Sequence, residues 1–276
     1  MIMRSWFLIF ASALAVCWVV APAAALEFAI PRGIGLGQAV VLSDLSASAL
    51  LQFPSASISK GTGVLESGIL RRFGLKDLDE ALLVGGYRFG RFTAVGGFSQ
   101  FGRSELYTEK TFKFAAACKV GNVGMGVTWS HLSLSFGGSY SGLSVSTIGA
   151  SLSYRQRRVL LALAADNLTS PVLELGSPDI KPQYSVRAEL LGRGSFSVVT
   201  GATFEDKQKP RFSIGQIVNV SSRASLLWSL SSEPLVYAGG LEVNISYGRV
   251  GYYTSYHPIL GFTNCVSLSY RWGGEN

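Results

Sequence analysis

The sequence predicts an all-β protein, namely a closed antiparallel up-and-down transmembrane β-barrel of about 14 strands. Its 276 residues are 48% hydrophobic but only 15% charged, and they include 32 glycines. Soluble domains carry roughly 25% charged residues, so many of these side chains are expected never to meet water. An apolar N-terminal stretch and a period-two alternation of apolar and small polar residues complete the evidence. The composition excludes a disordered chain and, with three cysteines, a disulfide scaffold.

The N-terminus has the form of an export signal. Arg4 is the only charge before Glu27, and it precedes an unbroken apolar run over 6–20 and then Ala21-Pro22-Ala23-Ala24-Ala25. A basic start, an apolar centre and a small-x-small site are typical of a secretory signal peptide. We expect residues 1–25 to be cleaved as this signal peptide. The alternative, a retained anchor, is disfavoured because the run is shorter than the roughly 20 residues that span a bilayer.

Apolar and polar residues alternate through the remainder of the chain. In Val266–Trp272, Val, Leu, Tyr and Trp share one face, whereas two Ser and an Arg share the other. Successive side chains of a strand point to opposite faces, so this pattern indicates a strand with one apolar face. Leu241–Tyr247 and Ile148–Arg155 repeat it, and turn signals such as Gly121-Asn122 separate the runs. We therefore expect hairpin after hairpin across a barrel domain of residues 56–276.

The two faces decide between a soluble β-sandwich or barrel and a transmembrane barrel. The polar face is mostly Ser, Gly, Thr and Asn, whereas a soluble sheet carries many charges there. We expect aromatic residues on the apolar face near strand ends, namely Tyr247, Tyr252, Tyr253, Tyr256, Tyr270 and Trp272. An outward apolar band with aromatic girdles and a polar interior is typical of a transmembrane barrel. Dividing roughly 216 residues from Ser57 to Trp272 among 14 strands leaves about 15 for each strand and its connection.

Residues 26–55 break the alternation and are expected to form a plug in the lumen. Glycines occupy positions 33, 35 and 37, which predicts a Gly-rich strand or loop. Ser43-Asp44 then precedes an Ala/Leu-rich stretch that ends at Phe53-Pro54, which predicts a helix. The expected plug residues are Arg32, Gly33, Gly35, Gly37, Asp44 and Pro54. The glycine pattern lacks the βαβ context of a nucleotide-binding loop.

This segment resembles the N-terminus of the PorV/PorQ family of FadL-like bacterial outer-membrane barrels (the OmpP1/FadL/TodX superfamily). Arg32–Val41 follows the family's Arg-Ala-x-Gly-Met-Gly-Gly-Ala-x-Val opening, and Ser43-Asp44 with Ala47 and Ala49 follows its helix start. Phe53-Pro54-Ser55-Ala56 stands where the family has Asn-Pro-Ala-Gly, so the Asn of that turn is replaced here. Asn167–Pro171 resembles the end of a mid-barrel strand, and Gly261–Tyr270 resembles the closing strand.

The resemblance implies a plugged barrel in a Gram-negative outer membrane. FadL-like relatives transport hydrophobic small molecules, whereas the PorV branch serves a type IX-like secretion system as an accessory for secreted proteins. Outer-membrane lipid is then an expected partner, as is the barrel-assembly machinery acting on the C-terminal strand. A structural or docking barrel without conduction is the alternative, and a barrel enzyme is a remote one. The formal net charge of +7 would suit anionic headgroups or an acidic partner, and no nucleic-acid partner is expected.

The sequence offers no chemistry-bearing constellation. His131 and His257 are far apart and lack a partner motif, and no His, Cys or carboxylate cluster has the spacing of a metal site. We expect no catalytic, cofactor-binding or metal site, no cofactor and no enzymatic activity. Lys113, Arg155 and Arg271 are expected to line the lumen, where they either favour anions or pair with lumen carboxylates.

Export predicts a mature protein that begins at Leu26. Intact mass measurement of the membrane fraction should show loss of residues 1–25. A mass that retains them would contradict cleavage and support the anchored alternative.

Overall fold

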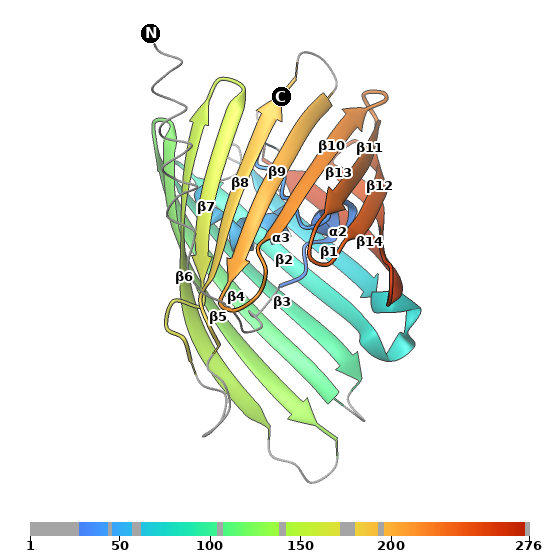
Figure 1. The fold of residues 1–276 in the computed structure, drawn as a ribbon. Coiled ribbons are helices and arrows are strands. Elements are labelled where there is room, and N and C mark those ends of the chain that lie inside the picture. The colour runs from blue at the N-terminus through green and yellow to red at the C-terminus, as the bar shows by residue number, and fades with distance from the viewer. Residues whose placement is uncertain are drawn as a thin grey trace.

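A computed structural model describes residues 28–43, 46–56, 62–103, 107–137, 142–171, 180–192 and 196–273. Within these ranges, fourteen strands form one closed antiparallel barrel, which confirms the predicted architecture and strand number (Figure 1). The strands are β1 (Gly63–Arg71), β2 (Asp79–Phe89), β3 (Phe92–Arg103), β4 (Tyr107–Val120), β5 (Val123–Phe136), β6 (Leu143–Gln156), β7 (Val159–Asp166), β8 (Gln183–Leu191), β9 (Phe196–Glu205), β10 (Arg211–Asn219), β11 (Ala224–Ser231), β12 (Val236–Ile245), β13 (Gly248–His257) and β14 (Gly261–Trp272).

Each strand pairs with its neighbours in the chain, and β1 pairs with β14 to close the ring. The closing register runs from Gly63 opposite Trp272 to Arg71 opposite Asn264. One end of the barrel has two-residue turns, for example 121–122 between β4 and β5 and 157–158 between β6 and β7. We call it the short-turn end and the opposite one the long-loop end. In bacterial barrels the short turns face the periplasm.

The two faces of the strands differ as the alternation predicts. On β4, Phe112 and Phe114 are exposed on the outside, whereas Thr111, Lys113 and Ala115 are buried on the inside. Large apolar side chains are likewise exposed around the ring, on strands from β1 to β14. An apolar outer surface of this extent suits the hydrocarbon of a bilayer. The helices within the described ranges are all too short or too polar to cross a bilayer.

The position of Tyr253 differs from the prediction that it lies on the apolar outer face. We predicted it on the outside, but its side chain is only 2% exposed and its hydroxyl donates to Glu242 inside the barrel. Its neighbour Tyr252 is exposed on the outside. Adjacent residues of a strand cannot share a face, so only one of the two can look outward.

The plug consists of the short helices α2 (Pro31–Gly35) and α3 (Ala47–Gln52) and the 3-10 turn η1 (Pro54–Ala56). Figure 1 shows α2 and α3 inside the ring of strands. The prediction of a strand or loop over the glycines was wrong, because Pro31 at the first helical position favours a helical turn. The turn ends where Gly37 and Gln38 take positive φ values of 54° and 67°.

Helix α3 begins later than predicted. Its N-cap is Ser46, whose Oγ accepts a hydrogen bond from the Ala49 N–H at 3.3 Å. Ser43 instead donates to a wall carboxylate, which removes it from the capping role. Asp44, the other predicted helix start, lies outside the described residues. The predicted end is confirmed, since α3 stops at Gln52 with Phe53 as its C-cap.

Inward-facing glycines make room for the plug at its closest approaches to the wall. A Cβ at Gly124 of β5 would lie 1.9 Å from the Ser55 carbonyl oxygen of η1. A Cβ at Gly97 of β3 would lie 2.5 Å from the Leu51 side chain of α3. The plug is therefore fitted to this wall. A side chain at position 124 would displace its backbone, and one at position 97 would displace the Leu51 side chain.

Replacing Gly124 by Ala should destabilise the protein, because backbone atoms of the plug must shift. We expect the free energy of unfolding to fall by about 1–3 kcal/mol, measured by urea unfolding in lipid vesicles. Gly85→Ala is the matched control, since its Cβ would make only ordinary contacts, with the Leu65 side chain at 3.5 Å and the Val64 carbonyl oxygen at 3.9 Å. Equal stability of the two variants would contradict a plug seated against β5.

Candidate functional site

The lumen holds the main apolar core of the described residues, and the plug supplies much of it. Leu36, Leu50, Leu51 and Phe53 have no exposed surface. They pack against inward wall residues such as Val84 and others in the same cluster. The plug is therefore a packed part of the barrel, and three wall carboxylates, Glu242, Glu189 and Glu66, hold it in place. We call these the anchor carboxylates.

Glu242 on β12 binds the start of the plug. Arg32 Nη2 donates to Glu242 Oε2 at 2.9 Å, and Arg32 Nε lies 2.7 Å from Oε1. Tyr253 donates its hydroxyl to Oε1 at 2.8 Å, and Arg249 Nε lies 3.7 Å from Oε2. Arg32 is 6% exposed and Glu242 is 1% exposed. A buried charge is tolerated only when it is paired, so each of the two groups holds the other in the lumen.

Glu189 on β8 binds the middle of the plug. Its Oε2 accepts hydrogen bonds from the Leu42 and Ser43 N–H groups, both at 2.7 Å. Its Oε1 accepts the Ser43 hydroxyl at 2.5 Å. One carboxylate thus satisfies two backbone donors in a segment without regular secondary structure. Such charge-assisted bonds are about twice as strong as neutral ones.

Glu66 on β1 binds the start of α3. Its Oε2 accepts both the backbone N–H and the hydroxyl of Ser48 at 2.8 Å. The first N–H groups of a helix lack partners within the helix, and a negative charge there is favourable. Glu66 and Glu189 stand seven strands apart in the fourteen-strand ring, on opposite walls. The plug is therefore tied across the full width of the barrel.

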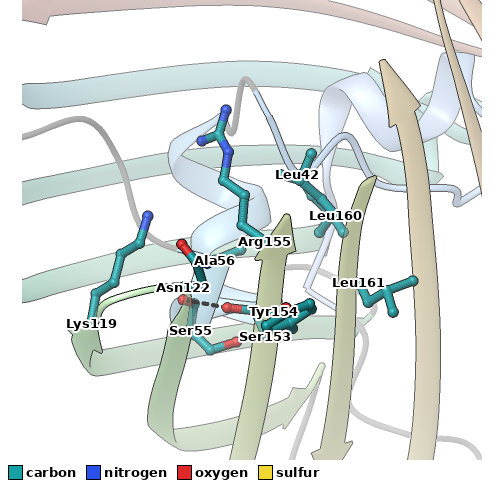
Figure 2. Close-up of a pocket in the computed structure, with 10 residues that line it drawn as sticks. All are labelled: Leu42, Ser55, Ala56, Lys119, Asn122, Ser153, Tyr154, Arg155, Leu160 and Leu161. Atoms are coloured by element: carbon teal, nitrogen blue, oxygen red, sulfur yellow. Dashed lines mark hydrogen bonds between the residues drawn. The ribbon is translucent and has the colours of Figure 1, made fainter. Parts of the chain in front are cut away.

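The end of the plug meets β5 and β6 near the short turns. Ser55 N–H donates to Ser151 Oγ at 3.1 Å, and Ser153 Oγ donates to the Ser55 carbonyl at 2.7 Å. A cavity of about 10 Å³ remains here, and Figure 2 shows the side chains that surround it. Its lining includes Lys119 of β4 and Arg155 of β6. A space of this size holds about one water-sized group.

The three residues that we predicted to line the lumen lie in different surroundings. Lys113 is 4% exposed and its Nζ lies 3.0 Å from Asp166 Oδ1, so it pairs with a lumen carboxylate. Arg155 is exposed at the short-turn mouth, and Arg271 is half-buried at the same end. Sequence reasoning did not single out the anchor carboxylates. The one feature of the sequence that marks these carboxylates is a Glu at an inward position between apolar neighbours, as in Leu241-Glu242-Val243.

The predicted plug residues lie together in the lumen where the structure describes them. Arg32, Gly33, Gly35 and Pro54 are buried, and Gly37 lies beside them at the end of α2. Gly35 lies close to β12 and β13, because a Cβ there would be 3.2 Å from the Gly239 carbonyl oxygen. These residues shape the plug, and among them only Arg32 brings a charge.

A hollow of about 830 Å³ lies over the outer face of β2–β6, near the short-turn end of β14. Exposed apolar side chains such as Phe114, Trp129 and Ile148 line it. Small outward residues, including Ala94, Gly96 and Ala116, form the wall between them. The hollow is therefore an apolar depression in the surface that faces lipid in a transmembrane barrel.

A small apolar cluster lies inside the barrel toward the long-loop end. Leu132 and Leu134 of β5 and Val145 of β6 pack with Ile180, which precedes β8. The hollow and this cluster share strands β4–β6 but lie on opposite faces of the wall. Across the described ranges, His, Cys, Asp and Glu side chains form no group of three or more that could hold a metal ion.

Solved structures with the same fold include a toluene transporter and an outer membrane protein. The Pseudomonas putida toluene transporter TodX has a TM-score of 0.57 at 9% identity, covering 91% of this chain and 98% of its own. A TodX variant described as a monoaromatic hydrocarbon channel scores 0.61 at 9% identity, covering 90% and 100%. Omp33 of Acinetobacter baumannii scores 0.51 at 10% identity, covering 77% and 98%. At these identities the match establishes the fold alone.

Comparisons of the sequence with protein-family models and with curated proteins give no match. The PorV/PorQ resemblance therefore stays a prediction.

The Arg32–Glu242 pair should show strong coupling. Arg32→Met and Glu242→Gln should each lower the free energy of unfolding by about 3 kcal/mol or more, because each breaks a buried ion pair. The double variant should lose less than the sum of the two. Lys209→Met, which breaks the exposed pair with Glu233, is the control and should cost under about 1 kcal/mol. Additive losses from the two buried variants would contradict the pairing.

Proposed function

We propose that the protein is an outer-membrane barrel that passes hydrophobic small molecules into the membrane. The observation that supports this most is a lumen filled by an anchored plug beside an apolar hollow of about 830 Å³ in the outer wall. A filled lumen disfavours a straight aqueous path for hydrated solutes. The hydrocarbon transporter TodX shares the fold, so we infer a substrate class that includes monoaromatic hydrocarbons.

The apolar surfaces suggest a route for such a molecule. The inner cluster around Leu132, Leu134 and Ile180 offers apolar contacts near the long-loop end. The outer hollow offers apolar contacts on the other side of the same strands. Ala116 lies on the outer face at the hollow, and Ala115 behind it belongs to the apolar core that the plug fills. The inner cluster is displaced from the hollow along the same strands, toward the long-loop end. Apolar transfer into lipid is favourable by about 25 cal/mol per Å² of surface removed from water.

A secretion-accessory or docking barrel is the second candidate. The anchored plug favours it, because a barrel that only binds exported proteins needs no opening. The resemblance to the PorV/PorQ family supports the same role. Both candidates share the outer-membrane location and lipid as a partner, and both make the protein a non-enzyme.

Filling the outer hollow should slow uptake of a hydrocarbon. In proteoliposomes loaded with an apolar trap, Ala116→Phe should reduce the initial uptake of labelled toluene several-fold, because the new ring occupies the hollow. Ala188→Phe is the matched control, since Ala188 lies on the outer face of β8 away from the hollow. Equal uptake by both variants would contradict the lateral route, and no uptake above protein-free vesicles would favour the docking barrel.

Removing the plug should open the pore. In planar bilayers the intact protein should show little steady conductance, and a variant lacking residues 26–53 should conduct steadily. Absence of conductance in the deletion variant, once its barrel is shown to be folded by circular dichroism, would contradict a plugged pore.

A further inference from the structure

The short-turn mouth carries a cluster of positive charge around the cavity at the plug end. Lys119 ends the inward face of β4, and Arg155 ends that of β6. Figure 2 shows both side chains extending in the same direction beside the cavity. Lys119 and Arg155 line the same cavity of about 10 Å³, which brings their charges near one another. Like charges held this close repel one another, and a bound anion would relieve that repulsion.

The lining of this cavity contains no acidic side chain among the described residues. Beyond the two cations it consists of Leu42, Ser55, Ala56, Asn122, Ser153, Tyr154, Leu160 and Leu161. β4 carries a second inward lysine, Lys113, which pairs with Asp166. One inward lysine of this strand therefore has a carboxylate partner, whereas the described lining of the cavity beside Lys119 has no carboxylate. Two other lumen carboxylates, Glu189 and Glu242, are engaged with the plug. Lys119 and Arg155 thus stand beside a cavity whose lining contains no carboxylate among the described residues.

Ser55 of the plug lines the cavity and carries a hydroxyl donor. It is 1% exposed, and its Oγ is buried without a hydrogen-bond partner. Its backbone groups, in contrast, are bonded to Ser151 and Ser153. A buried hydroxyl without a partner costs free energy, so it favours a ligand atom that can accept its proton. The cavity of about 10 Å³ has room for one such oxygen-sized atom.

We propose that this mouth is a binding site for a phosphate-type oxyanion. One oxygen accepts from Ser55 Oγ in the cavity, and the others contact Lys119 Nζ and the Arg155 guanidinium at its exposed rim. Arginine and lysine are the side chains that proteins use most for such groups. The phosphate comes either as a free ion or as the headgroup of a phospholipid, since both present the same oxygens. Because Ser55 belongs to the plug, an anion here also ties the plug to β4 and β6.

Calorimetric titration of the full-length protein in neutral detergent tests the site. Inorganic phosphate is one ligand, and short-chain phosphatidylglycerol below its micelle concentration is the other. We expect binding that weakens with salt, and about tenfold weaker binding in Lys119→Met and in Arg155→Gln. Ser55→Ala should weaken binding several-fold without changing the charge. Lys110→Met is the control, because Lys110 is exposed on β4 toward the opposite end of the barrel.

The outcomes separate the two sources. Binding of phosphate alone supports a free-ion site, and binding of only the lipid supports a headgroup site. Phosphate or lipid should also raise the unfolding midpoint of the unmodified protein more than that of Ser55→Ala. Absence of binding by both ligands overturns the proposal, as does binding that Lys119→Met, Arg155→Gln and Ser55→Ala all leave unchanged.

Discussion

The structure depends on how charge is accommodated inside a ring whose outside is apolar. Glu66, Glu189 and Glu242 are each 1–2% exposed, far from bulk water. Isolated ionised carboxylates in such surroundings would be very costly, so each needs donors. The plug brings these donors: the guanidinium of Arg32, the hydroxyls of Ser43 and Ser48, and backbone N–H groups. The lumen and the plug therefore stabilise one another.

This mutual dependence explains the fit between wall and plug. Polar anchors fix where the plug lies, and inward glycines let its backbone approach the strands, as Gly124 does beside Ser55. Apolar residues of the plug, such as Leu51 and Phe53, then fill the remaining space. Phe53 also lies under the Arg187 guanidinium, 5.6 Å from its ring centre, so one wall cation packs on the plug. The plug and the inner wall therefore form one packed core.

Much of the fold follows from the sequence because strands of a barrel face two different surroundings. Leu, Val and Trp alternate with Ser and Thr, and this period alone indicates the faces and the approximate strand number. The prediction from this period was wrong at Tyr253, which lies inside the barrel while Tyr252 lies outside. Both side chains are amphipathic, so only the register of the strand decides which of them faces the lumen. The prediction was also wrong at α2, since five residues with two glycines give too little pattern to reveal a helical turn.

The candidate site was less predictable than the fold, because its contacts join distant parts of the chain. Arg32 and Glu242 are 210 residues apart, and nothing local to either residue identifies the partner. Lys113 and Arg155 looked alike as inward cations, yet the first meets Asp166 and the second reaches the mouth. Such differences depend on height along the barrel, which the alternation of faces does not encode.

Hydrogen–deuterium exchange of the plug amides in lipid measures the central interaction directly. If the anchor carboxylates hold the plug in the lumen, the N–H groups of Leu42, Ser43 and Ser48 exchange as slowly as those of the barrel strands. Exchange at these three positions within seconds, at the rate of an unprotected chain, would contradict the account.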